Sequence, residues 1–281
     1  MLRQRVITAV LLLAVFLPAL FAADPMYFVV FTAALMVAAA WEWGRLSGQS
    51  QTVALAGAAL MGLACLGLWV LQPDPAWLAW IWPGAALAWF GLAVFALYKG
   101  VPYWATLPHA IRCGGGLVLL LVSWQALVQS RGLGINFLLS VMCLVWVADV
   151  SAYFAGRAWG GRWIARKLAL TISPGKTWEG VFGALLGVGV LALVWRYAES
   201  QDAGSSPSIF SRVADQWGAQ GVIVLGLLVV AGVVGDLLES LFKRAAGVKD
   251  SSGLLPGHGG VLDRVDALLP VMPLALCLVA R

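Results

Sequence analysis

The chain has 281 residues, of which 62% are hydrophobic and only 11% are charged, and 15 are tryptophan. A soluble core of this length does not need a mean hydropathy of +0.90. Composition therefore excludes a soluble globular protein and predicts an all-α, polytopic integral membrane protein. We attribute the net charge of +5 to membrane topology and contact with anionic lipid, and not to nucleic-acid binding. No two cysteines form a C-x-x-C pair, so their positions indicate neither a zinc site nor a disulfide framework.

Apolar stretches close to the length that crosses a bilayer, about 20 residues, recur along the whole chain, and we expect about nine transmembrane helices. They are predicted over residues 6–23, 26–43, 53–71, 77–97, 107–128, 133–154, 177–197 and 222–242, with a short final span at 267–280. The first follows Arg3 and Arg5 and could be read as a cleaved signal peptide. We prefer an uncleaved span, because the rest of the chain is also membranous.

Lysine and arginine are distributed unequally between the two sides of this predicted bundle. With the N-terminus inside, all 18 of them fall on the inner face except Arg131, Arg196, Arg212 and Arg281. The positive-inside rule therefore favours this orientation in the cytoplasmic (inner) membrane. It places the N-terminus and the main polar segments on the cytoplasmic side, and leaves residues 200–220 as an external loop.

A short charged pair ends the second predicted span. Glu42 and Arg45 lie three residues apart, which brings their side chains onto one face of a helix. We interpret them as a surface ion pair at the inner end of this span, in preference to a catalytic role.

The densest group of ionisable residues lies at 235–266, between two apolar runs. On a helix over 222–244, one stripe carries Asp236, Glu239, Ser240 and Lys243. A glycine-rich loop follows, which allows the backbone to turn tightly and approach a ligand. Because acids come from both the helix and the segment after the loop, they could converge on a divalent cation such as Mg²⁺, which prefers oxygen ligands. The alternative is an interfacial loop whose charges meet only headgroups and water.

A second polar group begins inside the span predicted at 133–154. Asp149 interrupts an apolar run, and Tyr153 lies one turn further on the same face, in the stretch D-V-S-A-Y-F-A-G-R. An acid inside a membrane span needs a partner or a function. A buried arginine partner is the structural alternative for Asp149.

The segment T-I-S-P-G-K-T-W-E-G, residues 171–180, predicts the start of a helix at the inner face. Ser173 is the expected N-cap and Pro174 the first helical residue, with Lys176 and Thr177 in the first turn. The free N–H groups of such a helix start could hold a phosphate. The alternative is a capped helix whose Lys176 reaches toward water along the membrane surface.

Residues 240–266 follow the order S-L-F-K-R-x4-K-D-x-S-G…P-x-H-G-G-x-x-D-R-x-D, which closely resembles the signature of the phosphatidate cytidylyltransferase (CDP-diacylglycerol synthase) family. The stretches D-x-x-A-Y-x-x-G-R and S-P-G-K-T-x-E-G resemble what precedes it in that family, so the resemblance covers roughly residues 146–266. It implies N-terminal transmembrane helices over 1–130 and a catalytic region over 131–281.

The resemblance also implies the reaction of CTP with phosphatidate to give CDP-diacylglycerol and pyrophosphate. Mg²⁺ is the expected cofactor, with a second cation as a further expectation. A homodimer is suggested as well. The expected metal ligands are Asp236 and Asp263, with Asp149, Asp250 and Asp266 as second candidates. The side chains expected to bind phosphates are Lys176, Lys243, Arg244, Lys249 and Arg264. Further expected substrate-binding groups are Ser173, Thr177, Ser240, Tyr153 and His258.

The residues alone indicate only metal-assisted phosphoryl or nucleotidyl transfer at the inner face. A CTP-dependent polyprenol or phytol kinase is the nearest alternative, which would direct an alcohol at the γ-phosphorus and need a general base. A transporter is a more distant alternative, because neither inverted repeats nor broken central spans are visible.

Overall fold

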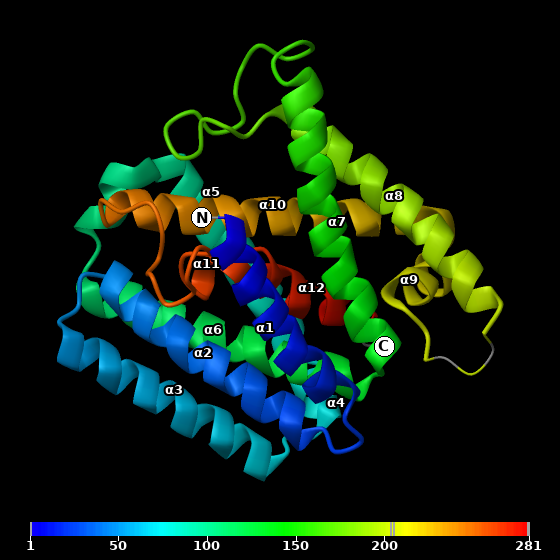
Figure 1. Ribbon diagram of the computed structural model, residues 1–281, viewed down its shortest axis with the longest axis horizontal. Helices are drawn as coiled ribbons and strands as arrows, with labels where there is room; N and C mark the ends of the chain where they lie inside the picture. Colours follow the sequence, from blue (N-terminus) through cyan, green and yellow to red (C-terminus); the bar gives the residue numbers. More distant parts are fainter. Residues whose placement is uncertain (1, 203, 205, 280–281) are drawn as a thin grey trace.

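The computed structural model describes residues 2–202, 204 and 206–279, and no strand occurs among these residues (Figure 1). Ala203 and Ser205, within the predicted external loop, lie outside the described residues, as do Ala280, the last residue of the predicted final span, and Arg281. The helices are α1 (Leu2–Phe21), α2 (Met26–Leu46), α3 (Gln51–Leu71), α4 (Pro75–Leu78), α5 (Ile81–Thr106), α6 (His109–Gly132), α7 (Ile135–Trp159), α8 (Trp178–Ser200), α9 (Ile209–Trp217), α10 (Gly221–Ala245), α11 (Leu262–Val265) and α12 (Leu268–Val279), with a 3₁₀ turn η1 (Gly218–Gln220).

Within the described residues, 8 segments are long and apolar enough to cross a membrane, which confirms the predicted polytopic all-α class. The predicted ninth span forms only the 12-residue helix α12. At about 1.5 Å per residue, α12 is shorter than the hydrocarbon layer. It nevertheless lies at the centre of the bundle, packed against α5, α6, α7 and α10 (Figure 1). Because protein surrounds α12, its length is not set by contact with lipid.

Contacts between distant segments define one end of the bundle, here called the inner end because it holds the start of α1. Thr8 Oγ1 in α1 donates a hydrogen bond of 2.8 Å to the Pro256 carbonyl of the loop after α10. His109 at the start of α6 lies 2.9 Å from the Ser47 carbonyl at the end of α2. The polar segments predicted to share one face therefore do meet.

The opposite, outer end is tied together in the same way. Arg131 at the end of α6 donates to the Leu20 carbonyl at the end of α1, with 3.0 Å between the atoms. Trp217 at the end of α9 donates to the Leu278 carbonyl of α12 at 3.1 Å. Successive long helices thus alternate in direction between the two ends, as the predicted order of spans requires.

Close packing between helices positions the polar segments. Gly183 and Gly187 of α8 lie against Ala155 and Ser151 of α7, where an added Cβ would overlap these side chains. Small residues one turn apart allow two membrane helices to approach closely. The start of α8 and the loop before it are consequently held beside the inner half of α7.

A similar approach joins α10 to α12. A Cβ on Gly235 would come within 2.8 Å of the Pro270 side chain and nearer still to the Asp266 carbonyl, so only glycine allows this crossing. The next residue on α10 is Asp236. The crossing therefore places the acids of α10 beside Asp266. Because α10 also packs against α5, and α12 against α6, helices from both predicted regions contribute to this arrangement, and the division at residue 130 stays a prediction.

Candidate active site

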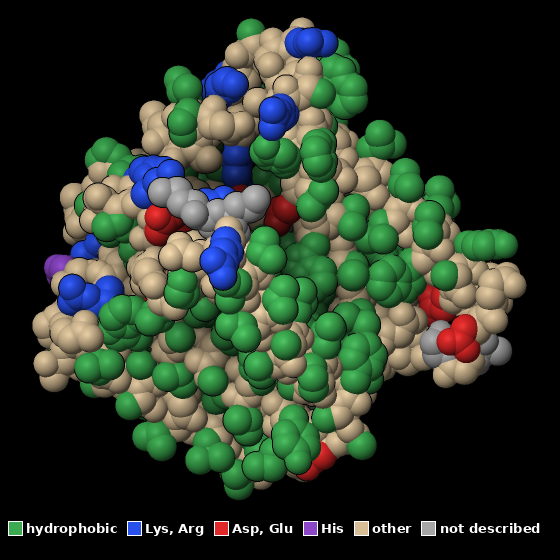
Figure 2. Space-filling model, in the orientation of Figure 1, with side chains coloured by type: hydrophobic (Ala, Val, Ile, Leu, Met, Phe, Trp, Pro, Cys, Tyr) green, Lys and Arg blue, Asp and Glu red, His purple; other side chains and the backbone are tan. Residues whose placement is uncertain are grey.

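A polar cavity of about 610 Å³ opens at the inner end between α7, α8, α10 and the segment around α11. Figure 2 shows basic and acidic side chains gathered around this hollow, whereas much of the surrounding surface is hydrophobic. The charged and hydroxyl-bearing residues that line it are Asp149, Tyr153, Arg157, Lys176, Thr177, Asp236, Glu239, Lys243, Asp250, Asp263, Arg264 and Asp266.

One wall is the inner part of α10, where the predicted helical stripe faces the cavity with Asp236, Glu239 and Lys243. Ser240, which shares this stripe, is set back from the wall and donates a 3.4 Å hydrogen bond to Asp236 Oδ1. Spacing of three and four residues thus predicted correctly which side chains of α10 lie together.

Acids from two segments converge beside this wall. Asp236, Glu239 and Asp266 each offer a carboxylate oxygen, and these oxygens all lie within 4.8 Å of one another. Glu239 is 6% exposed, and its Oε1 has no hydrogen-bond partner among the described residues. Burial and the neighbouring Asp236 carboxylate raise the pKa of Asp266 to about 7. A buried group of oxygens that repel one another fits a hard divalent cation, which would neutralise them.

Asp263 belongs to a different set of contacts. Its Oδ1 lies 2.5 Å from Lys243 Nζ, and its Oδ2 accepts hydrogen bonds from the Gly260 and Ser251 N–H groups at 2.7 and 2.9 Å. Burial by itself would raise the pKa of this carboxyl. Hydrogen bonds from Glu239, from the Lys243 ammonium and from the two N–H groups outweigh burial and hold the pKa of Asp263 well below its ordinary range. Asp263 thus fixes the loop and the position of Lys243.

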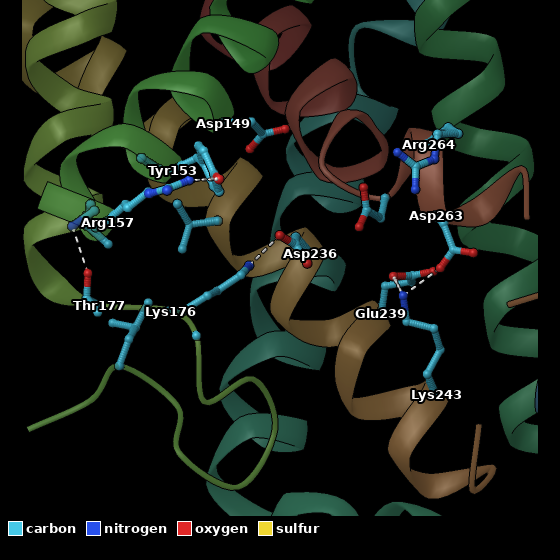
Figure 3. Close-up of a pocket in the computed structure, with 18 of the residues that line it drawn as sticks. Asp149, Tyr153, Arg157, Lys176, Thr177, Asp236, Glu239, Lys243, Asp263 and Arg264 are labelled. Carbon is cyan, nitrogen blue, oxygen red and sulfur yellow. Dashed lines mark hydrogen bonds and ion pairs between the residues drawn. The ribbon is translucent and has the colours of Figure 1, made fainter. Parts of the chain in front are cut away.

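Lys243 connects the two sets of acids. Its Nζ lies 2.5 Å from both Glu239 Oε2 and Asp263 Oδ1, and its side chain is 12% exposed (Figure 3). The sequence prediction paired Asp236 with Asp263 around a cation. Both carboxylates line the cavity, but the acids whose oxygens approach one another are Asp236, Glu239 and Asp266.

The facing wall comes from α7 and the loop before α8. Asp149 and Tyr153 lie on the same face of α7, as their spacing predicted, and Arg157 donates a 3.0 Å hydrogen bond to the Tyr153 hydroxyl. Lys176 reaches across from the loop, and its Nζ is 2.5 Å from Asp236 Oδ2 (Figure 3). This ion pair connects the two walls of the cavity.

The predicted cap of α8 was wrong by several residues. Thr177 is the N-cap, and its Oγ1 accepts a 3.1 Å hydrogen bond from the Gly180 N–H. Ser173 instead belongs to a tight turn, because its N–H donates to the Ala169 carbonyl and its own carbonyl accepts from Lys176 N–H. Helical hydrogen bonding can begin only after this turn. Lys176 therefore stands before the helix, where it is free to reach α10.

The surface ion pair predicted for Glu42 was also wrong. Glu42 is 0% exposed, and its carboxylate accepts hydrogen bonds from the N–H groups of Val261 and Leu262 and from the hydroxyls of Ser251 and Ser252. Its expected partner Arg45 donates instead to the Gln49 carbonyl. The burial of Glu42 depends on a loop more than 200 residues away, which helical spacing does not reveal.

Several predicted site residues lie outside the cavity wall, namely Ser173, Ser240, Arg244, Lys249 and His258. Arg244 donates to the Ile172 and Val248 carbonyls and so connects two loops. Two charged wall residues were missing from the final set of predicted site residues. Glu239 was visible on the α10 stripe, and Arg157 within the motif that follows Asp149. Position on a shared helix face was the signal that could have selected both.

A helical membrane bundle with acids and cations gathered around an inner cavity defines an integral membrane enzyme that handles charged substrates. A family model described as the cytidylyltransferase family matches residues 3–280, and the chain belongs to this family.

Curated relatives extend the match over almost the whole chain. It is 40% identical to the phosphatidate cytidylyltransferase of Pseudomonas aeruginosa over 279 residues, which is 97% of this chain and 95% of the relative. The enzyme of the same name from Haemophilus influenzae is 35% identical, over 97% of this chain and 96% of the relative. The one from Brucella abortus is 37% identical, over 86% and 80%. The family resemblance that the motifs indicated is therefore confirmed, and the similarity extends to the N-terminal helices.

Proposed function

We propose that this protein transfers the cytidylyl group of CTP to phosphatidate, giving CDP-diacylglycerol and pyrophosphate. The observation that carries the proposal is the inner cavity. An acid cluster lies at one wall of this cavity, and both walls carry cationic side chains. The names of the curated relatives supply the reaction and both substrates. The cavity opens at the membrane surface, where a soluble nucleotide and a lipid headgroup can meet.

The reaction forms a bond between a phosphatidate phosphate oxygen and the α-phosphorus of CTP, and breaks the bond from that phosphorus to pyrophosphate. The attacking oxygen is already an anion at neutral pH, so a strong general base is not required. Bringing two polyanions together and neutralising their charge are then the main tasks of the enzyme. Lys176, Lys243 and Arg264 supply cations for this purpose around one space.

Asp236, Glu239 and Asp266 are the residues that would hold Mg²⁺, because their oxygens converge and one of those on Glu239 lacks a partner. A bound Mg²⁺ supplies charge neutralisation for the triphosphate. We assign Asp263 to hold Lys243 and the loop, and keep Asp149 and Asp250 as second candidates for metal ligands. Because the inner end gathers most of the basic residues, we infer that it faces the cytoplasm. The homodimer expected from family resemblance stays a prediction.

Product analysis with labelled CTP tests the reaction. Purified protein supplied with phosphatidate, Mg²⁺ and CTP labelled at the α-phosphate should transfer that label to lipid. CTP labelled at the γ-phosphate should release it as pyrophosphate. Transfer of the γ-label to a polyprenol would support the lipid kinase instead, and uptake of a solute by vesicles without CTP would support transport.

A further inference from the structure

One face of α7 changes character along its length. Met142, Trp146, Asp149 and Tyr153 follow one another at intervals of four, three and four residues, so they lie on one stripe. Asp149 and Tyr153 line the polar cavity, whereas Met142 and Trp146 line a neighbouring apolar hollow. The polar end of the stripe is nearer the inner end of α7. The polar cavity and the apolar hollow are therefore successive parts of one path along this helix.

The segment around α11 forms the opposite side of the same path. Arg264 lines both the polar cavity and the apolar hollow, and its neighbours Val261 and Val265 line the hollow. Arg264 is exposed, and it forms no ion pair within the described part of the chain. A cation without an acid partner, placed where a polar space meets an apolar one, is suited to the charged end of an amphipathic ligand.

The apolar hollow has a volume of about 180 Å³ and lies among α1, α2, α6, α7 and α12. Its remaining lining residues, among them Leu12, Phe16, Leu35 and Leu127, are apolar except for Thr32. Helix α1 crosses in front of the bundle at this place (Figure 1). Most of its side chains are exposed. Figure 2 shows hydrophobic side chains lining a recess beside the charged cavity.

We propose that this apolar hollow holds an acyl chain of the phosphatidate substrate, with the lipid phosphate at Arg264. The proposal rests on the proposed function and names where its lipid lies. A phospholipid of the inner leaflet has its phosphate at the surface and its chains toward the bilayer centre, which is the order of polar and apolar side chains along α7. CTP has no apolar part that would fill the hollow.

Other apolar spaces fit this role less well. The hollow between α8 and α10 measures about 850 Å³, but its lining shares no residue with the polar cavity among those described. A gap beside Glu239 and Trp43 does adjoin the acid cluster, but at about 30 Å³ it is too small for an acyl chain. Continuity with the polar cavity and room for a segment of an acyl chain coincide in the hollow beside Arg264.

The test compares a long-chain and a short-chain substrate, dioleoyl and dibutyryl phosphatidate, with the full-length protein in detergent. Leu35→Trp would fill the hollow and Trp146→Ala would remove part of its wall. Each should raise KM for the dioleoyl lipid by about tenfold, the effect of losing contact with one or two methylene groups, and leave KM for the dibutyryl lipid and for CTP within about twofold. Val190→Trp, in the hollow between α8 and α10, is the matched control and should change none of these values.

The outcomes separate the two proposals. If the wild-type protein converts neither lipid with CTP, the proposed function fails and the acyl-chain assignment fails with it. If the wild type is active but Leu35→Trp and Trp146→Ala affect both lipids equally, or match Val190→Trp, the lipid chain lies elsewhere. An unchanged KM for CTP shows that each variant is folded. If Leu35→Trp changes KM for CTP, the result for Trp146→Ala alone decides where the acyl chain lies.

Discussion

The Glu42 carboxylate accepts a 2.7 Å hydrogen bond from the N–H group of Leu262, although the two residues are 220 positions apart. A second bond, of 2.9 Å, comes from the Val261 N–H. These N–H groups belong to the start of α11, which has no earlier helical carbonyl to accept from them. Glu42 therefore anchors the short helix that carries Asp263 and Arg264 to the body of the bundle.

Glu42→Gln is expected to lower kcat by about tenfold or more. The amide replaces one carboxylate oxygen by a donor, which leaves a buried N–H or hydroxyl without an acceptor at a cost of about 1–3 kcal/mol. Arg264 and Asp266 would then be held less accurately, and turnover would fall more than KM for CTP changes. Steady-state kinetics together with thermal melting measure both effects.

Glu199 provides a matched control, because it anchors a loop in the same manner at the outer end. Its carboxylate accepts hydrogen bonds from the Ser208 N–H and hydroxyl and from the Ser211 hydroxyl. Glu199→Gln should reduce stability but leave kcat close to the wild-type value. Equal losses of turnover in the two variants would show that Glu42 acts only through general stability.

Lys176→Ala is expected to raise KM for CTP by about tenfold, since one charge-assisted contact to a phosphate is worth about 1.5–3 kcal/mol. The Lys176 side chain is 22% exposed and lies against Asp236, so it is positioned to exchange this acid for a substrate phosphate. Arg166→Ala, an exposed cation in the same loop but away from the cavity wall, is the control. Unchanged CTP kinetics in Lys176→Ala would place the nucleotide elsewhere.

The parts of this site that the sequence predicted are those set by local periodicity. Asp236 and Lys243 lie on one helix face because seven residues make two turns, and Asp149 and Tyr153 do so because four make one. Membrane class and the number of long helices follow similarly from apolar length. Such relationships require no knowledge of how the helices pack.

What the sequence did not predict depends on contacts between distant segments. Glu42 resembles any acid at a helix end until the loop after α10 covers it. The start of α8 was placed at Ser173 because serine followed by proline is a common cap, but a turn closed by Ala169 competes for the same residue. The grouping of Glu239 with Asp266 requires the close crossing at Gly235.

Glu239→Gln and Asp266→Asn are each expected to raise the Mg²⁺ concentration needed for half-maximal activity by about tenfold to a hundredfold, with Asp236→Asn at least as severe. Each change removes a charged oxygen from the cluster that would hold the cation. Titration of activity with Mg²⁺, and of direct binding with Mn²⁺, measures the shift. Asp215→Asn, an exposed acid on α9 at the outer end, should behave as the wild type. A normal Mg²⁺ requirement in Glu239→Gln would remove Glu239 from the set.

Asp263→Asn is expected to reduce stability in a manner that depends on pH. The folded protein holds the pKa of Asp263 below its value in the unfolded chain, which is about 3.9. The ionised carboxylate therefore contributes stability that is fully present above about pH 5 and is lost as pH falls through the unfolded pKa toward the folded one. At neutral pH the variant should melt roughly 5 °C below the wild type, and this difference should shrink between about pH 5 and pH 3. Thermal melting in detergent across this range measures it, with Asp24→Asn at an exposed helix start as the control. A difference that stays constant with pH would mean that Asp263 stabilises the loop through its shape and hydrogen bonds rather than through its charge.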